Sequence, residues 1–228
     1  VVAPGVFDLI SARMLAEHDV EAAYMTGFGV VASHLGLPDA GLATYTDMVE
    51  RARLLAGVLD VPLIADADTG YGGLLNVRHT VRGYEAAGVA AIQLEDQEFP
   101  KKCGHTPGRR VVPLDDMVRK IEVAVDSRSS ADTLIVARTD ARTALGLDEA
   151  LRRAEAFAEA GADVLFVEAP ESEEELARLG RSFDVPLLVN VVEGGKTPIL
   201  SHARYAELGF RLAIHPASGF LAAAAALD

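Results

Sequence analysis

Short apolar segments alternate with amphipathic segments along the whole chain. Eight segments have the composition of β-strands, at residues 1–3, 22–26, 62–65, 90–94, 133–137, 164–167, 187–189 and 212–214. Their apolar residues are consecutive rather than alternating, which is typical of parallel strands that are buried on both faces. The pattern therefore predicts a parallel sheet that is covered on both sides.

The segments between these strands have helical periodicity, at residues 8–18, 46–59, 76–87, 114–125, 147–160, 172–181 and 202–208. Thr46 and Asn76 are candidate N-caps, because their side chains can accept a hydrogen bond from the first helical turn. Glycine readily takes the left-handed conformation that follows a helix, so a set of glycines is expected to end helices. These are Gly88, Gly161, Gly180 and Gly209.

Eight strand-then-helix units in 228 residues predict a closed (β/α)8 barrel of the TIM type with eight parallel strands. A doubly wound open sheet is the alternative, although it usually has fewer strands. No break in composition marks a second domain, so residues 1–228 are expected to form a single barrel domain. The chain stops inside an alanine-rich helical run after Ala222, so a C-terminal helical extension is expected to be missing or unseen.

Polar side chains follow seven of the eight predicted strands. In a (β/α)8 barrel the carboxyl ends of the strands form one rim, where active sites lie. The side chains expected at this rim are Tyr24, Thr26, Asp66, Asp68, Glu95, Arg138, Glu168, Asn190 and His215. Strand ends can be polar simply because they meet solvent, but that explains poorly an arginine, several carboxylates and an asparagine at one mouth. We therefore expect the rim to be an active site.

Three of the rim carboxylates suggest a metal site. Asp66 and Asp68 are two residues apart, so in an extended strand they point the same way. With Glu95 from the neighbouring strand they would form a site of hard oxygen ligands. Such a site suits Mg²⁺, with Mn²⁺ also possible, because these ions keep waters and take further ligands from the substrate. The alternative is that the two aspartates cap a helix.

The charge balance limits the class of ligand. The chain has 21 Lys and Arg against 34 Asp and Glu, a formal charge of −13. An acidic chain is a poor candidate for binding nucleic acid or an anionic membrane, and no apolar run reaches the ~18 residues of a membrane span. Positive charge gathers locally in residues 96–112. A structureless segment of this length is usually functional or disordered, and because this one concentrates positive charge we expect a mobile active-site loop that attracts an anion.

Cys103 is the only cysteine, so no intrachain disulfide can form, which fits a reducing cytoplasm. It lies in the run Lys101-Lys102-Cys103-Gly104-His105. Positive neighbours favour the thiolate, which suits a proton donor or acceptor near neutral pH. A covalent nucleophile with His105 as its base, or an inert buried cysteine, are the alternatives. No Cys-x-x-Cys pair is present, which disfavours structural zinc.

The motifs as a set resemble one known family, the isocitrate lyase and phosphoenolpyruvate mutase superfamily. They are collinear from residue 3 to about residue 220. They are Pro4-Gly5-Val6-Phe7-Asp8, Leu35-Gly36-Leu37-Pro38-Asp39, Asp66-Ala67-Asp68-Thr69-Gly70, Glu95-Asp96-Gln97, the run at 101–105, Ala137-Arg138-Thr139-Asp140-Ala141, Phe166-Val167-Glu168-Ala169 and Glu193-Gly194-Gly195-Lys196-Thr197-Pro198. The resemblance implies a (β/α)8 barrel, Mg²⁺, a small carboxylate substrate, a mobile loop around Cys103, and a homo-oligomer, by resemblance a tetramer.

The cysteine-bearing loop resembles the lyase branch of that superfamily. Methylisocitrate lyases typically have Ser-Gly-Gly-Gly where this chain has Thr26-Gly27-Phe28-Gly29, so Phe28 favours a differently shaped acid. The run at 193–198 leans toward dimethylmalate lyases. The implied activity is Mg²⁺-dependent cleavage of a 2-hydroxy di- or tricarboxylate to a 2-oxo acid plus a carboxylate. Alternatives are carboxyphosphonoenolpyruvate mutase-type phosphoryl transfer, oxaloacetate hydrolysis or decarboxylation, and a barrel that only binds.

The resemblance also implies roles for individual residues. Cys103 would protonate the carbanion that cleavage leaves, while Arg138 and His105 would neutralise its charge. Tyr24 would lie near the substrate hydroxyl, and Glu168 would position the loop or the substrate. Substrate-binding roles are implied for Thr26, Gly27, Phe28, Asp39, Lys102, Gly104 and Asn190. For 26–29 the residues alone leave two interpretations open, namely backbone N–H groups that face a carboxylate or a simple turn.

Overall fold

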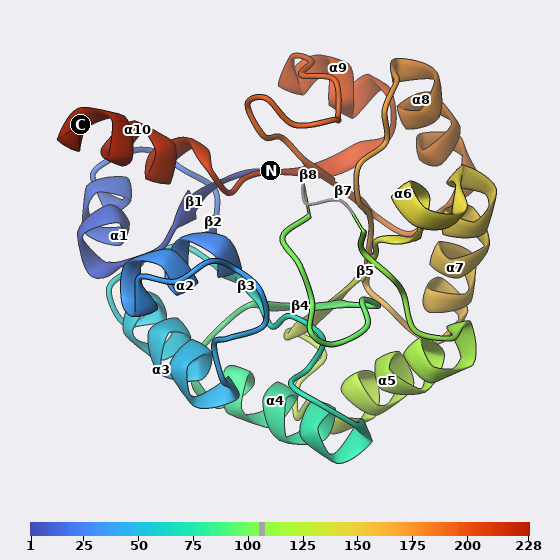
Figure 1. The fold of residues 1–228 in the computed structure, drawn as a ribbon, viewed down its shortest axis with the longest axis horizontal. Helices are drawn as coiled ribbons and strands as arrows, with labels where there is room; N and C mark the ends of the chain where they lie inside the picture. The colour runs from blue at the N-terminus through green and yellow to red at the C-terminus, as the bar shows by residue number, and fades with distance from the viewer. Residues whose placement is uncertain (105–107) are drawn as a thin grey trace.

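The computed structural model describes residues 1–104 and 108–228, and its centre is a closed barrel of parallel strands (Figure 1). The strands are β1 (Val2–Val6), β2 (Ala23–Met25), β3 (Leu63–Asp66), β4 (Ala91–Glu95), β5 (Leu134–Thr139), β6 (Val164–Val167), β7 (Leu187–Asn190) and β8 (Phe210–His215). Each strand pairs with the next, and β8 closes the barrel by pairing in parallel with β1. The predicted (β/α)8 barrel is therefore confirmed, and the open-sheet alternative is wrong.

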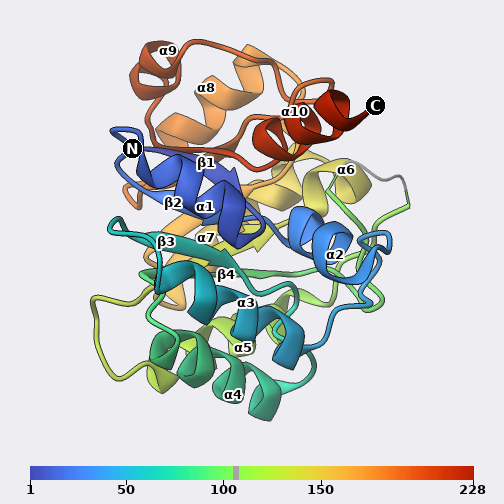
Figure 2. The ribbon, with the colours of Figure 1, turned by 90° about the vertical axis from the view of Figure 1, so that its left-hand side faces the viewer.

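Helices surround the barrel, as the views along and across it show (Figures 1 and 2). In the described ranges they are α1 (Leu9–Ala16), α2 (Gly27–Leu35), α3 (Tyr45–Ala56), α4 (Leu74–Ala86), α5 (Leu114–Ser127), α6 (Ala141–Leu145), α7 (Leu147–Glu159), α8 (Glu173–Ser182), α9 (His202–Glu207) and α10 (Ser218–Leu227). None of the helices described is long and apolar enough to cross a membrane.

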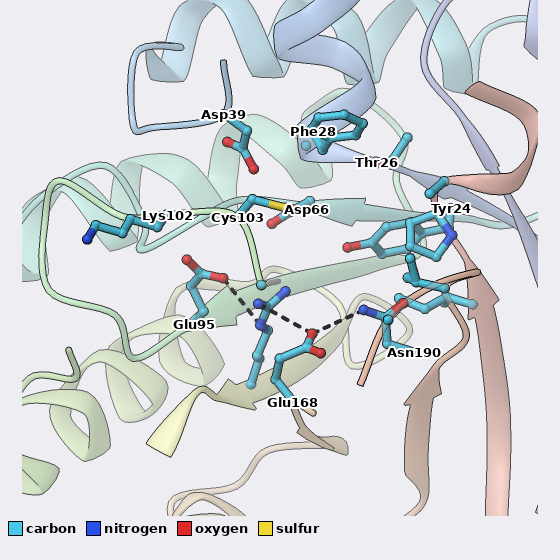
Figure 3. A pocket seen from close by; sticks show the side chains of 18 of the residues that line it. Tyr24, Thr26, Phe28, Asp39, Asp66, Glu95, Lys102, Cys103, Glu168 and Asn190 are labelled. Atoms are coloured by element: carbon cyan, nitrogen blue, oxygen red, sulfur yellow. Dashed lines mark hydrogen bonds and ion pairs between the residues drawn. The ribbon is translucent and has the colours of Figure 1, made fainter. Parts of the chain in front are cut away.

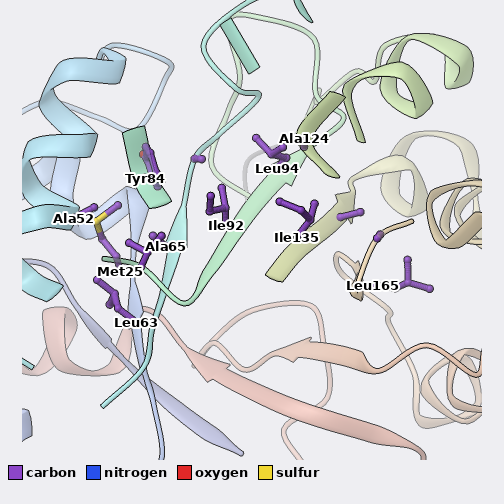
Figure 4. Packing of buried hydrophobic residues seen from close by; sticks show 14 of the residues in the cluster. Met25, Ala52, Leu63, Ala65, Tyr84, Ile92, Leu94, Ala124, Ile135 and Leu165 are labelled. Atoms are coloured by element: carbon purple, nitrogen blue, oxygen red, sulfur yellow. The ribbon is translucent and has the colours of Figure 1, made fainter. Parts of the chain in front are cut away.

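Apolar side chains cover both faces of the barrel wall. One cluster lies between the strands and the helices, where Ala65 of β3 and Ile92 of β4 pack with Tyr84 of α4 (Figure 4). A second cluster fills the barrel and comes from strands and their immediate neighbours, including Ile64. Consecutive residues such as Ile64 and Ala65 therefore belong to opposite faces of the barrel wall, and both faces are buried. This explains why the strands have consecutive apolar residues.

The helix starts differ from the prediction at two positions. α3 begins at Tyr45, and its N-cap is Thr44 rather than Thr46. Thr44 accepts from the Asp47 N–H at 3.3 Å and donates its own N–H to Asp47 Oδ2 at 2.8 Å, which completes a capping box. Asn76 lies inside the first turn of α4, where its Oδ1 accepts from the Gly73 N–H at 3.2 Å. Thr46 was favoured by composition alone, whereas the aspartate three residues on selects Thr44.

Three of the four predicted stop glycines behave as expected. Gly88, Gly161 and Gly209 have φ of 89°, 96° and 102° directly after helices. Gly180 was wrongly assigned, because it lies inside α8. A Cβ at Gly180 would lie 1.5 Å from the carbonyl oxygen of Leu208, so the glycine is needed for close packing rather than for a stop.

Two helices were not predicted. α2 begins directly after Thr26, whose Oγ1 accepts from the Gly29 N–H at 3.3 Å. The run at 26–29 is therefore a helix N-terminus, which the glycines at 27 and 29 concealed because glycine is a poor helix former. α6 has five residues and is too short for a periodic pattern to identify.

Candidate active site

A cavity of about 260 Å³ opens at the carboxyl ends of the strands, where the active site of a (β/α)8 barrel is expected. It brings together most of the predicted site residues, which are Tyr24, Thr26, Gly27, Phe28, Asp39, Asp66, Glu95, Lys102, Cys103, Gly104, Arg138, Glu168 and Asn190 (Figure 3). His105 falls outside the described residues. His215 does not line this cavity, and its Nε2 lies 2.9 Å from Nε2 of His202.

Arg138, at the end of β5, lies among three carboxylates. Its Nε and Nη2 donate to the two oxygens of Asp140 at 2.9 and 3.0 Å. Glu95 Oε2 lies 3.3 Å from Nε, and Glu168 Oε2 lies 3.4 Å from Nη2. Burial by itself lowers the pKa of this guanidinium, but the carboxylates more than offset that effect and hold the pKa well above its usual range. Arg138 is therefore a fixed positive charge on the cavity wall.

Glu168 and Asn190 form a second polar wall at the ends of β6 and β7. Asn190 Nδ2 donates to Glu168 Oε2 at 3.1 Å, next to Arg138 (Figure 3). Glu168 Oε1 and Asn190 Oδ1 are buried and have no hydrogen-bond partner within the described part of the chain. An unpaired buried acceptor is costly, so this wall is suited to a ligand that brings hydrogen-bond donors.

The acidic residues form a cluster around Lys101, which belongs to the predicted cationic run at 101–105 but was not predicted to contact these carboxylates. Nζ of Lys101 lies 2.5 Å from Asp39 Oδ1 and 2.6 Å from Asp68 Oδ1, and its side chain is 4% exposed. Lys102, which was selected, instead donates its Nζ to the carbonyl oxygen of Gly108 at 3.2 Å. Both lysines line the cavity, and sequence could not decide which of them enters the acidic cluster, because consecutive residues of a loop have no fixed periodicity.

Asp68 does not lie as predicted. β3 ends at Asp66, and Asp68 has φ of 47°, so the two carboxylates do not share a strand face. The Asp68 N–H instead donates to Asp66 Oδ1 at 3.0 Å. In the residues that the structure describes, no three His, Cys, Asp or Glu side chains form a complete metal site. Direct ligation of one ion by Asp66, Asp68 and Glu95 together therefore has no support in this geometry.

The charges of the cluster nevertheless fit an added cation. Burial and the neighbouring Asp68 raise the pKa of Asp66 to about 6. Burial also raises the pKa of Glu95 well above its usual range, although Arg138 opposes this effect. Glu95 Oε1 is buried and has no hydrogen-bond partner among residues 1–104 and 108–228. The carboxylates are thus short of positive charge, and a hydrated divalent ion would supply it without needing three direct protein ligands.

Tyr24 lies on the floor of the cavity. Its hydroxyl donates to Gln93 Oε1 at 3.2 Å, and Gln93 Nε2 donates to Asp66 Oδ1 at 3.3 Å. Burial and the charge of Asp66 raise the pKa of Tyr24 well above its usual range. Tyr24 therefore stays protonated near neutral pH and can act as a hydrogen-bond donor.

The loop after β4 carries Cys103 and Gly104 to the polar wall. The Cys103 N–H donates to the carbonyl oxygen of Asp39 at 3.2 Å, and the residue is half-buried in the cavity lining. A Cβ at Gly104 would lie 2.8 Å from Arg138 Nη2 and 3.1 Å from Glu168 Oε2, so only glycine fits. The structure does not test the predicted mobility of residues 96–112, which stays a prediction.

The opposite side of the cavity is apolar. Phe28 packs edge-on against Phe220 of α10 with ring centroids 5.1 Å apart, and Phe220 packs in the same way against Phe7. Other apolar residues of the lining are Val192, Ile214, Pro216, Ala217 and Leu221. Gly27 begins α2 beside Asp66, where a Cβ would lie 2.5 Å from Oδ2. The cavity therefore joins a charged wall to an apolar one.

Similarity to known proteins agrees with this arrangement. Residues 1–228 match the phosphoenolpyruvate phosphomutase family. The chain is 52% identical over 229 aligned residues to the 2,3-dimethylmalate lyase of Eubacterium barkeri, covering 100% of the chain and 79% of that relative. The chain belongs to the phosphoenolpyruvate mutase/isocitrate lyase superfamily. It is 42% identical to the 2-methylisocitrate lyase of Bacillus subtilis, covering 99% of the chain and 74% of that relative.

Solved structures agree in fold. A crystal structure of 2,3-dimethylmalate lyase superposes with a TM-score of 0.97 at 41% identity and covers 100% of this chain and 77% of its own. Phosphonopyruvate hydrolase, solved as a complex with oxalate and Mg²⁺, superposes with a TM-score of 0.88 at 31% identity, over 99% of this chain and 78% of its own. The protein is an enzyme of this superfamily, of the carbon–carbon lyase type, which confirms the predicted family and enzyme class.

Proposed function

We propose that the protein is a Mg²⁺-dependent lyase that cleaves the C2–C3 bond of a methyl-substituted 2-hydroxydicarboxylate such as 2,3-dimethylmalate. The observation that carries this proposal is the two-sided cavity. Arg138, Glu168 and Asn190 form a wall suited to carboxylate and hydroxyl groups, while Phe28 faces them from an apolar wall. The 52% identity to a 2,3-dimethylmalate lyase supports the same substrate.

The acidic cluster, defined as Asp39, Asp66, Asp68 and Glu95, would hold Mg²⁺ largely through water molecules. The raised pKa values of Asp66 and Glu95 and the unpaired Glu95 Oε1 support a cation here. When bound, Mg²⁺ lowers the pKa of the substrate 2-hydroxyl and stabilises the charge on that oxygen. The relative solved with oxalate and Mg²⁺ supports this choice of ion, with Mn²⁺ as a substitute.

The bond change is a retro-aldol cleavage. The 2-hydroxyl proton passes to a carboxylate of the acidic cluster, and C2 becomes the carbonyl of a 2-oxo acid. The electrons of the C2–C3 bond stay on C3, which becomes a carbanion conjugated with its own carboxylate. Cys103 then gives its thiol proton to C3. From 2,3-dimethylmalate the products are pyruvate and propionate, so the atoms balance without a further reactant.

The chain's own groups would stabilise the charge that develops. The guanidinium of Arg138 is held by Asp140 and would face the carboxylate that is conjugated with the carbanion. The fit of Gly104 against Arg138 and Glu168 would bring the Cys103 thiol to the same side of the substrate. Tyr24 would donate a hydrogen bond, because its raised pKa keeps it protonated.

The backbone at the start of α2 supplies a second carboxylate site. The N–H groups of the first helical turn have no partner within the helix, and Gly27 and Phe28 belong to that turn beside the cavity. One carboxylate of a dicarboxylate would therefore bind at α2 and the other at Arg138. The ring of Phe28 would contact the methyl groups between them.

A substrate panel with product analysis tests this proposal. The purified protein is incubated with Mg²⁺ or with EDTA and with 2,3-dimethylmalate, 2-methylisocitrate, isocitrate, oxaloacetate or carboxyphosphonoenolpyruvate, and the products are identified by mass. We expect pyruvate and propionate from 2,3-dimethylmalate, with Mg²⁺ only. Cleavage of another acid alone would overturn the substrate, and a rearranged phosphonate detected by phosphorus NMR would overturn the lyase reaction in favour of phosphoryl transfer.

We further propose that the protein is a homo-oligomer, by family resemblance a tetramer. Support comes from α10, whose ten residues include none that is buried. Leu221 and Leu227 are 44% and 89% exposed, which is unfavourable for large apolar side chains without a partner. Light scattering during size-exclusion chromatography measures the mass, and a monomer at micromolar concentration would contradict the proposal.

A further inference from the structure

Arg109 is a buried arginine for which the proposed reaction has no role. Its side chain is 1% exposed, although it belongs to the loop between β4 and α5. Nη1 donates to Oδ1 of Asp140, and Nη2 donates to Oγ1 of Thr143 at 2.8 Å. Removing a guanidinium from water costs free energy unless it is paired. Asp140 and Thr143 pair Nη1 and Nη2, whereas Nε is buried with no hydrogen-bond partner among the described residues. The buried charge of Arg109 is therefore held by Asp140.

Asp140 is shared between Arg109 and Arg138. Its Oδ1 accepts from both guanidinium groups, and its Oδ2 accepts from Arg138 Nε at 2.9 Å. The backbone N–H of Asp140 donates to Asp96 Oδ1 at 2.9 Å, which fixes the aspartate from behind. A bidentate pair fixes the plane of a guanidinium, so the position of the Asp140 carboxylate sets the orientation of Arg138.

Arg109 also attaches one arm of the Cys103 loop. The outgoing arm (97–104) and the returning arm (108–111) are joined by an antiparallel bridge between Gln97 and Val111 and by the Lys102 Nζ bond to the carbonyl oxygen of Gly108. Gln97 additionally holds the backbone of Lys102 with two hydrogen bonds of 2.9 and 3.0 Å. The two arms therefore form one unit, and Arg109 ties its returning arm to the barrel.

We propose that Arg109 is a positioning residue that links the seating of Cys103 to the orientation of Arg138 through Asp140. One carboxylate holds both the active-site guanidinium and the arm that returns from the thiol. Loss of Arg109 would free the arm and remove one of the two positive charges beside Asp140. This inference deepens the proposed lyase function and rests on it for the kinetic test only.

Alkylation of Cys103 tests, without any substrate, whether Arg109 holds the loop that carries Cys103. Cys103 is the only cysteine, so the rate of reaction with iodoacetamide reports on this loop alone. In R109M we expect alkylation about tenfold faster than in the wild type, because a hydrogen-bonded charge pair is lost. R110M is the matched control, since Arg110 is 78% exposed and pairs only with Glu98 at the surface in the described structure. Equal rates in R109M and R110M would overturn the proposal.

Steady-state kinetics test whether Arg109 also sets the orientation of Arg138, with whichever acid the wild type cleaves as the substrate. Misplacement of Arg138 should lower kcat of R109M by about 100-fold, and R109K should restore much of it because it keeps the charge beside Asp140. A purely structural role predicts lower thermal stability with unchanged kcat per folded site, and that result would overturn the link to Arg138. T143V removes the other partner and should shift both readouts in the same direction, but less.

The two proposals fail separately. A wild type that cleaves none of the acids in the panel would overturn the lyase function, while the alkylation comparison would still decide the role of Arg109. If R109M does not fold by circular dichroism, T143V carries the same comparison against R110M, because it removes the Thr143 partner of Arg109. A wild-type alkylation rate in T143V would then overturn the proposal.

Discussion

The ammonium group of Lys101 lies 2.6 Å from Oδ1 of Asp68, and both side chains are almost fully buried. The same nitrogen lies 2.5 Å from Asp39 Oδ1. Burial lowers the pKa of Lys101, but the carboxylates around it more than offset that effect and keep it protonated. Lys101 therefore provides positive charge to the acidic cluster that we propose to hold Mg²⁺.

Replacing Lys101 should make the cluster bind Mg²⁺ more tightly. K101M leaves Asp39 and Asp68 without a counter-charge, so the metal-free protein should be less stable and its Mg²⁺ dissociation constant should fall by about tenfold. Isothermal titration calorimetry measures the constant, and melting with EDTA measures the stability. K102M is the control, because Lys102 Nζ bonds to the Gly108 carbonyl rather than to the cluster. Unchanged or weaker Mg²⁺ binding in K101M would contradict the expectation.

Replacing Cys103 should separate binding from turnover. C103S keeps the size of the side chain but is a far weaker acid, so kcat should fall by about 100-fold or more while the dissociation constant of oxalate, a stable carboxylate ligand, stays within about twofold. Single-turnover kinetics and calorimetry measure the two quantities. Turnover at the wild-type rate would rule out the proton-donor role.

Replacing Phe28 should reduce the preference for methylated substrates. F28A removes the ring from the apolar wall, so the ratio of kcat/KM for 2,3-dimethylmalate to that for malate should fall by about tenfold. F99A is the matched control, because Phe99 is 70% exposed and does not line the cavity. An unchanged ratio in F28A would show that the methyl groups bind elsewhere.

Asp66 should make the stability of the metal-free protein depend on pH. Its pKa is raised to about 6, so the folded state binds the proton more tightly than the unfolded chain does. Its contribution to stability is full below about pH 4 and is lost as pH rises through about 6. D66N should therefore raise the free energy of unfolding at pH 7 by roughly 2 kcal/mol, and by less at pH 5.

Thermal melts in EDTA measure this difference, which corresponds to about 4–8 °C in Tm at pH 7 for a chain of this size. Asp60→Asn is the control, because Asp60 is exposed. An equal increase in the Tm of D66N at pH 5 and at pH 7 would mean that the stabilisation does not come from removing the charge of Asp66.

The local pattern of apolar residues was sufficient to predict the barrel. Ile64 and Ala65 are both apolar because one faces the barrel interior and the other faces the helices, and this requirement is visible in sequence. Helix starts were less predictable, because residues 44 and 46 are both threonine. Only the reciprocal hydrogen bonds between Thr44 and Asp47 distinguish them. The carboxyl ends of parallel strands share one rim, so Arg138, Glu168 and Asn190 could be assigned to one site before the structure was known.

The sequence alone determined the fold, the family motifs and the list of polar residues at the rim, because these depend on periodicity and on topology that parallel strands impose. Only the tertiary structure decided that Lys101 rather than Lys102 enters the acidic cluster, that Asp68 leaves the strand, and that Asp140 is shared by two arginines. It also placed Phe220 behind Phe28, although 192 positions separate them in the chain. Such contacts depend on the paths of loops and on packing between distant segments, for which no local repeat exists.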